Sequence, residues 1–260
     1  METALRVGKS LVNVNTRGGF FNWSHAGRPV MPLVEGSGRQ THACWPVFGA
    51  PAGPIPGATV KMGRHGFFRT SELSLMTQEA SSITLRLGRT FGERKDDLYA
   101  QFPFDFITQL HLTLEGEKTL HFRFLHKNLS MSPVTVDLAL HSYFPYEEEG
   151  VTLLDLQGKP YRSKENKSGI LHDACLRGPL IDRDWDFAIG NKPGPWRLRY
   201  NDGRIISLNT GRSNRPVSHN QVWTEPAQGK FLAFEPVSPA NVLKYGETAI
   251  LDVIIRLENS

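Results

Sequence analysis

The sequence contains little cysteine and no long apolar run, and each shortage excludes a class of protein. Its 260 residues include two cysteines, Cys44 and Cys175, which are too few for a disulfide scaffold or for a zinc site with four thiolate ligands. No stretch reaches the roughly 18 uncharged apolar residues that a membrane-spanning helix requires. The N-terminus lacks a basic segment followed by an apolar one, so no secretory signal is visible. We therefore expect a reduced cytoplasmic protein with no membrane partner.

A large excess of charge of one sign is also missing. Thirty Lys and Arg residues against 26 Asp and Glu residues give a net charge of +4. Proteins that bind nucleic acids usually concentrate basic residues in a stripe or patch, whereas here Arg94 and Lys95 stand beside Asp96 and Asp97. We therefore expect no nucleic-acid partner, and a small anionic ligand is a better use of a few converging arginines.

Short motifs for cofactor and metal chemistry are absent as well. None of the nine histidines lies in the H-x-H or H-x-x-H spacing that often supplies two ligands to a metal. The Gly-x-Gly-x-x-Gly, Walker and Gly-x-Ser-x-Gly patterns do not occur either. Nucleotide hydrolysis, dinucleotide redox and α/β-hydrolase chemistry therefore have no support, and a cupin-like metal site would have to draw on ligands far apart in the sequence.

What the chain does have is alternation of apolar and polar residues with a period of two. The pattern recurs in Phe106–Leu114, Leu120–Phe124, Val134–His141, Trp196–Tyr200 and Ala249–Leu257. This period is typical of half-buried strands, and no segment of 12 or more residues keeps the spacing of an amphipathic helix. With no repeat and no linker, the sequence predicts an all-β protein with one domain over residues 1–260.

Turn residues separate these runs. The Glu115–Glu117 segment (E-G-E) predicts a tight hairpin, and a turn centred on Gly116 would place His111 opposite His121. Seven of the twelve residues in Pro46–Gly57 are Gly or Pro, which predicts a long loop. Long loops without secondary structure in compact domains are usually functional or disordered.

Two segments around this loop have the composition of a sugar site. Residues 38–49 and 63–69 combine polar groups with aromatic rings and glycines. Aromatic rings stack on the C–H faces of sugars, and glycines allow close approach. The alternative is that aromatics such as Trp45 and Phe67 only pack in the core.

Two ionisable residues occupy unusual positions in predicted strands. His141 lies on the polar side of its strand, and the following Phe144-Pro145 predicts that the strand ends close by. Glu235 interrupts the mostly apolar run Phe231–Val237. A carboxylate in apolar surroundings is costly unless it is paired, and such an environment suits a general base. A structural histidine and an edge-strand glutamate facing water are the simpler alternatives.

Four motifs, in this order along the chain, resemble the aldose 1-epimerase (galactose mutarotase-like) superfamily, and within it the hexose-6-phosphate 1-epimerase branch. Cys44–Gly49 (C-W-P-V-F-G) resembles that branch's C-W-P-W-F-G, and His65–Arg69 (H-G-F-F-R) resembles H-G-F-A-R. His141–Phe144 (H-S-Y-F) is similar to H-T-Y-F, and Phe234–Pro236 (F-E-P) is similar to V-E-P. The resemblance spans residues 35–240 and implies a large antiparallel β-sandwich.

The resemblance also implies roles for individual residues. Glu235 would be the general base and His141 the general acid, while His65 would hold the sugar ring beside Arg69. Asp182, in the sequence I-D-R-D-W, looks like the aspartate of the family's D-R-V-Y motif, which binds sugar hydroxyls.

Recognition of the rest of the substrate would fall to residues flanking these motifs. Trp45 is expected to bind the sugar, and Arg39 and Arg64 are expected to bind a phosphate together with Arg69. The family's R-G-G-I-P stretch reads G-R-Q-T-H at residues 38–42, so Arg39 is displaced by one position from the family's arginine.

The implied activity is interconversion of the α and β anomers of an aldohexose, expected to be a hexose 6-phosphate, by general acid–base ring opening and closure. This chemistry needs no metal or organic cofactor, and the expected partner is a sugar or sugar phosphate bound by a monomer or weak homodimer. The alternatives are a non-catalytic carbohydrate-binding β-sandwich and a mutarotase that acts on free aldoses.

Overall fold

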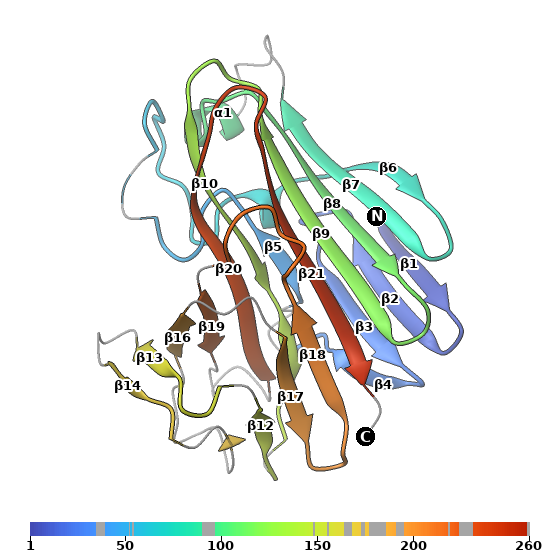
Figure 1. The fold of residues 1–260 in the computed structure, drawn as a ribbon. Helices are drawn as coiled ribbons and strands as arrows, with labels where there is room; N and C mark the ends of the chain where they lie inside the picture. The colour runs from blue at the N-terminus through green and yellow to red at the C-terminus, as the bar shows by residue number, and fades with distance from the viewer. Residues whose placement is uncertain are drawn as a thin grey trace.

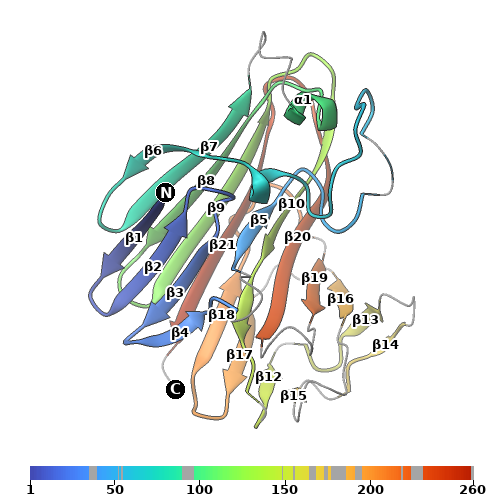
Figure 2. The same cartoon turned by 180° about the vertical axis from the view of Figure 1, so that it is seen from behind.

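The structure is a computed structural model, and three antiparallel sheets account for most of the described chain (Figures 1 and 2). The described residues are 1–34, 40–51, 53, 55–89, 97–147, 149–154, 156–163, 168–172, 175–176, 186–190, 195–217, 219–223 and 231–258.

The first sheet comes from the N-terminal part of the chain and has four strands. Its order is β1 (Glu2–Val7), β2 (Ser10–Asn15), β3 (Phe21–His25) and β4 (Arg28–Met31). An isolated bridge between Phe21 and Thr41 links this sheet to the start of the second one.

The second sheet has eight described strands and carries the candidate site. Its order is β14 (Ser168–Ile170), β13 (Pro160–Ser163), β16 (Asp186–Gly190), β19 (His219–Trp223), β20 (Phe231–Leu243), β10 (Val134–His141) and β5 (His42–Cys44), with β11 (Tyr143–Pro145) also paired to β20.

The third sheet has nine described strands. Its order is β15 (Cys175–Leu176), β12 (Val151–Leu153), β17 (Trp196–Tyr200), β18 (Ile205–Asn209), β21 (Thr248–Glu258), β9 (Thr119–Asn128), β8 (Phe106–Leu114), β7 (Ser82–Arg89) and β6 (Ser74–Gln78). The helices of the described chain are short, namely α1 (Asp97–Gln101) and the 3-10 turn η1 (Phe68–Thr70).

The core lies between the nine-stranded sheet and the layer formed by the other two. Figures 1 and 2 show β1–β4 on one face of the nine-stranded sheet, and Phe21 of β3 stacks on Phe122 of β9 at 6.1 Å. A single buried cluster contains Trp23, Leu140 and Phe124, one from each sheet. The antiparallel β-sandwich predicted from the sequence is therefore confirmed.

The predicted alternation is confirmed in β8, β9 and β17, while β10 and β21 each end it in a run of consecutive buried residues. In β8 every second side chain is buried from Phe106 to Leu114, because these positions face the core and the intervening ones face outward. The β8–β9 hairpin forms as predicted, but the predicted register is wrong by one position on each strand. Leu114 pairs with Leu120, so His121 faces Thr113 and His111 faces Arg123. The turn is centred on Glu117 rather than Gly116, which shifts every cross-strand pair.

The described part of the chain contains no helix long and apolar enough to cross a membrane.

Candidate active site

The candidate site is built on a row of side chains that crosses neighbouring strands of the eight-stranded sheet. His141, the last residue of β10, pairs directly with His42 on β5. On its other side, the pairings Ala139–Val237 and Tyr143–Ala233 bracket His141 and Glu235, so Glu235 of β20 lies opposite His141. Residues opposite each other in an antiparallel sheet project to the same face. The register alone therefore gathers one carboxylate and two imidazoles.

His141 and Glu235 form a close pair. The Nε2 atom of His141 lies 3.4 Å from Oε1 of Glu235, and the two side chains are 8% and 2% exposed. Burial of a single charge would be costly, whereas an imidazolium beside a carboxylate stabilises both charges. The separation is slightly longer than a normal hydrogen bond, which spans 2.7–3.2 Å. The pair thus holds a proton donor and a proton acceptor side by side.

Four other aromatic rings surround the His141 imidazole. His42 stacks on it with 4.9 Å between ring centroids and 19° between planes, while His65 meets it edge-on at 5.0 Å. The Tyr143 ring lies 4.8 Å away and the Trp223 ring 6.1 Å away. These contacts restrict rotation of the imidazole, so its Nε2 atom stays directed toward Glu235.

His65 reaches the site from an irregular segment and has an unusual backbone. Its φ is +62°, in the left-handed region that costs a non-glycine residue about 1–3 kcal/mol. Two hydrogen bonds to Gly49 hold it there: His65 N–H donates to the Gly49 carbonyl at 2.8 Å, and Gly49 N–H donates to His65 Nδ1 at 3.2 Å. Because Nδ1 accepts, the neutral imidazole carries its proton on Nε2.

The electrostatics of His65 favour the same neutral form. Burial of the ring, followed by the charges of the neighbouring His42, Arg69 and Arg64, lowers the pKa of His65 from 6.5 to about 3. At neutral pH His65 is therefore an uncharged hydrogen-bond donor, which suits recognition of a sugar oxygen.

The backbone at position 66, directly after His65, requires a glycine. Its φ is +72°, and a Cβ atom at this position would overlap the carbonyl group of Trp45. The two residues form an isolated parallel bridge. The backbone of the His65 motif is thereby fixed against the loop that carries Phe48.

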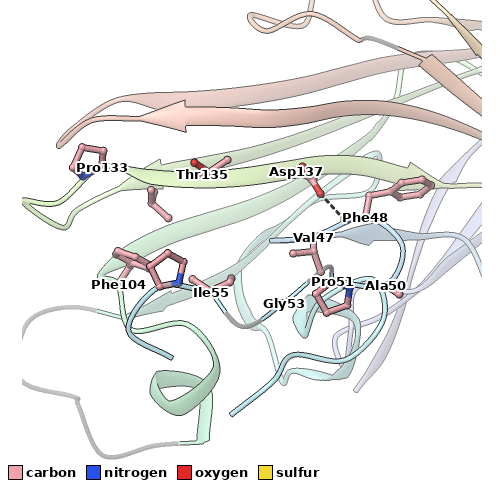
Figure 3. Close-up of a pocket in the computed structure, with 12 residues that line it drawn as sticks. Val47, Phe48, Ala50, Pro51, Gly53, Ile55, Phe104, Pro133, Thr135 and Asp137 are labelled. Carbon is pink, nitrogen blue, oxygen red and sulfur yellow. Dashed lines mark hydrogen bonds between the residues drawn. The ribbon is translucent and has the colours of Figure 1, made fainter. Parts of the chain in front are cut away.

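Asp137 ties that loop to both strands that carry the His141–Glu235 pair. Its Oδ2 accepts the Phe48 N–H at 2.9 Å, and its Oδ1 accepts the N–H of Ala240 on β20 at 2.8 Å. Phe48 in turn meets the His65 ring at 5.4 Å. Figure 3 shows Asp137 and Phe48 bordering a pocket of about 480 Å³ between β10 and the loop. Asp137 is therefore a structural link between the strands and the His65 segment.

Trp45 lies elsewhere. It is fully buried and packs against Phe67, Phe102, Phe106 and His126, with ring centroids 4.7–5.1 Å apart. The expectation that Trp45 binds the sugar finds no support in this position, because its ring lies in the core and not with His141. The alternative stated for the aromatics, core packing, describes it better.

Of the three arginines expected to bind phosphate, two lie near His65 and the third lies outside the described residues. Arg69 is half-buried in η1 and Arg64 is exposed, and both are close enough for their charges to lower the pKa of His65. Arg39 and Asp182 lie outside the described residues, so their expected roles stay predictions.

Cys44 lies beside the site, two residues along β5 from His42, and does not suit nucleophilic chemistry. It is fully buried and packs against Ala139 and Val237. Burial, followed by the negative charge of Glu235, raises the pKa of the Cys44 thiol well above its usual value. Among the described residues, no group of three His, Cys, Asp or Glu side chains could hold a metal ion.

Sequence reasoning missed His42 and Asp137. His42 stood in a segment noted only for its composition, and Asp137 in a strand noted only for its alternation. Their partners are about 90–103 residues away in the chain. No local signal marks such contacts.

Comparison with known proteins gives a family match and a set of similar structures. The family profile described as aldose 1-epimerase matches residues 34–174. A galactose mutarotase related enzyme from Lactobacillus acidophilus is 16% identical with a TM-score of 0.83, and the alignment covers 100% of this chain and 98% of that one. A galactose mutarotase-like protein from Lactobacillus casei is 14% identical with a TM-score of 0.81, covering 99% and 100%. No curated protein sequence gives a significant match.

Proposed function

Because this chain belongs to the aldose 1-epimerase family, we propose that it interconverts the α and β anomers of an aldohexose, with Glu235 as general base and His141 as general acid. The observation that carries this proposal is the buried contact of 3.4 Å between His141 Nε2 and Glu235 Oε1. A site that only binds sugar does not require a paired acid and base in its centre.

In the reaction each group exchanges one proton with the sugar. The Glu235 carboxylate removes the proton of the anomeric hydroxyl, and the His141 imidazolium gives a proton to the ring oxygen as the C1–O bond of the ring breaks. Rotation about the C1–C2 bond of the open-chain aldehyde exposes its other face. The reverse transfers then close the ring and restore both groups. A well-placed acid or base contributes about 10²–10⁴-fold to such a rate.

The neutral His65 would hold the sugar during this exchange. Its Nε2–H can donate to a sugar oxygen, while Nδ1 stays bound to the Gly49 N–H. A second cationic imidazole beside His141 would oppose protonation of the acid, and the low pKa of His65, about 3, avoids this conflict.

We further propose that the substrate carries a phosphate, as in a hexose 6-phosphate. The support is the positive charge of Arg69 and Arg64 beside His65. Arginine binds phosphate through a planar fork, and a charge-assisted hydrogen bond contributes about 1.5–3 kcal/mol. Two such contacts would favour the phosphorylated sugar by about 10²-fold or more in kcat/KM.

The experiment that tests both parts is a panel of anomerisation rates. A freshly dissolved α-anomer of glucose, galactose or their 6-phosphates is followed by polarimetry or NMR with and without the protein. We expect catalysis, with the 6-phosphates preferred about 10²-fold, and loss of that preference in Arg69→Ala. The control is Arg256→Ala, an exposed arginine of β21. Equal use of free and phosphorylated sugars, unchanged in Arg69→Ala, would leave a free-aldose mutarotase; binding without catalysis would leave a carbohydrate-binding β-sandwich.

The two proposed catalytic groups predict a bell-shaped dependence of kcat/KM on pH. The acid limb should report loss of the Glu235 carboxylate and the basic limb loss of the His141 imidazolium, because each must be in its charged form. The reference values for such groups are about 4.3 and 6.5. Activity that stays flat from about pH 4 to pH 9 would contradict the pairing, and so would a basic limb that persists in His141→Asn.

A further inference from the structure

His42 occupies a position beside the proposed acid that the proposed reaction does not use. It lies on β5, directly opposite His141 in the register, and is 3% exposed. The two imidazoles lie face to face, 19° from parallel. Of the four ring contacts described above for His141, this is the one closest to a parallel stack.

The His42 ring is itself held in place. Its Nδ1 lies 2.9 Å from the Gln40 carbonyl oxygen, which can only accept, so Nδ1–H donates. The Phe20 ring meets the imidazole edge-on at 5.2 Å. A ring fixed by its own hydrogen bond and by packing can serve as a rigid support for a neighbour.

We propose that His42 is the positioning residue of the acid: its flat face supports the His141 ring and keeps Nε2 directed toward Glu235 and the sugar. This inference rests on the proposed function, since the orientation matters only if His141 transfers a proton. Small displacements of a catalytic group can cost up to about 10²-fold in rate, so a dedicated support has a measurable effect.

A neutral aromatic face also suits a charged neighbour. The face of a π-system attracts a cation, whereas two stacked imidazolium ions would repel each other. The groups that face His141 from the surrounding elements are His42 from β5, Glu235 from β20, His65 from the segment before η1, Tyr143 from β11 and Trp223 from β19, with the charges of Arg64 and Arg69 close to His65. Of these, Glu235 favours the imidazolium and the arginines oppose it, while the His42 face favours it when the His42 ring is neutral.

The simpler alternative is that His42 only fills space. Two substitutions separate the alternatives. Each places a bulky apolar side chain at position 42, and the two side chains differ in shape. His42→Phe retains a flat aromatic face, whereas His42→Leu fills the site without one. Circular dichroism and Tm show whether each variant is folded. Both lose the hydrogen bond to Gln40, so a difference between them does not come from that hydrogen bond.

The experiment measures kcat, KM and their pH dependence for the wild type and both variants, together with the NMR titration of the His141 side chain. The His141 resonances are assigned by their absence in His141→Asn. In His42→Leu we expect kcat to fall about ten-fold with KM nearly unchanged, and the basic limb to move to lower pH. His42→Phe should keep kcat within about three-fold of the wild type.

The outcomes distinguish this inference from the proposed function. If the Leu and Phe variants have the same kcat and the same His141 titration, His42 is a packing residue and the inference is overturned. If the wild type anomerises no sugar but the His141 titration changes in His42→Leu and not in His42→Phe, the support is real and the proposed function is wrong.

Discussion

Glu235→Gln is expected to lower the anomerisation rate by at least about 10²-fold while the protein stays folded. The amide keeps the shape of the carboxylate but cannot take a proton from the anomeric hydroxyl. The side chain is 2% exposed, so water cannot readily replace the base. The substitution also removes the negative charge beside His141, which weakens the support for the protonated acid. Both effects act on kcat.

The measurement compares kcat and KM of Glu235→Gln with those of the wild type and of Glu2→Gln. Glu2 is exposed on β1, far along the chain from the site, and makes a matched control for the loss of one carboxylate. Far-UV circular dichroism and Tm establish that the variants are folded. Near-normal turnover in Glu235→Gln would remove Glu235 from the mechanism.

Acidification is expected to destabilise the protein strongly before most carboxylates titrate. Burial lowers the pKa of both His65 and His126 from 6.5 to about 3, so neither takes up a proton in the folded state until the pH is near 3. Unfolding releases both to titrate near 6.5. Their contribution to the free energy of unfolding is therefore complete above pH 6.5 and is lost as the pH falls from 6.5 toward 3. Between pH 7 and pH 5 the loss is about 2 kcal/mol for each histidine, or about 4 kcal/mol together.

Urea unfolding at pH 7, 6 and 5 measures this loss. His121 acts in the opposite direction, because its hydrogen bond to Asp252 raises its pKa, so differences between variants are more informative than the total. His126→Phe keeps an aromatic ring in the cluster around Trp45 but cannot take up a proton, and should reduce the loss by about 2 kcal/mol. The exposed His172→Gln should leave it unchanged. An unchanged pH dependence in His126→Phe would contradict the assignment.

The sequence was a good guide to strands because their signal is local. Alternation with a period of two survives throughout β8, β9 and β17, since each has one face against the core, whereas consecutive residues are buried over Leu138–His141 of β10 and Leu251–Ile255 of β21. Register is a weaker signal, and the β8–β9 turn shows why. A shift of the turn centre by one residue leaves the alternation intact but changes the partner of each residue. That residues 1–260 form one domain stays a prediction.

The site was predicted in part because three of its residues carry a local signal in the sequence. His141, Glu235 and His65 stand in motifs and in unusual local contexts, and the structure brings them together. Trp45 stands in a motif too, but an aromatic residue beside glycines packs in a core as readily as it faces a sugar. His42 has no local context of its own, since its significance arises from pairing with a residue 99 positions later (141 − 42).

The placement of these groups along one row of the sheet has a consequence for how the protein can diverge. A one-residue insertion or deletion inside β10 or β20 would turn His141 or Glu235 to the opposite face, because side chains alternate with a period of two. Changes of length in the connecting loops leave the row untouched. We therefore expect relatives to vary the loops that surround the sugar, and with them the choice of substrate, while the number of residues from Ala139 to Tyr143 and from Ala233 to Val237 stays constant. Alignment of diverse relatives would check this expectation.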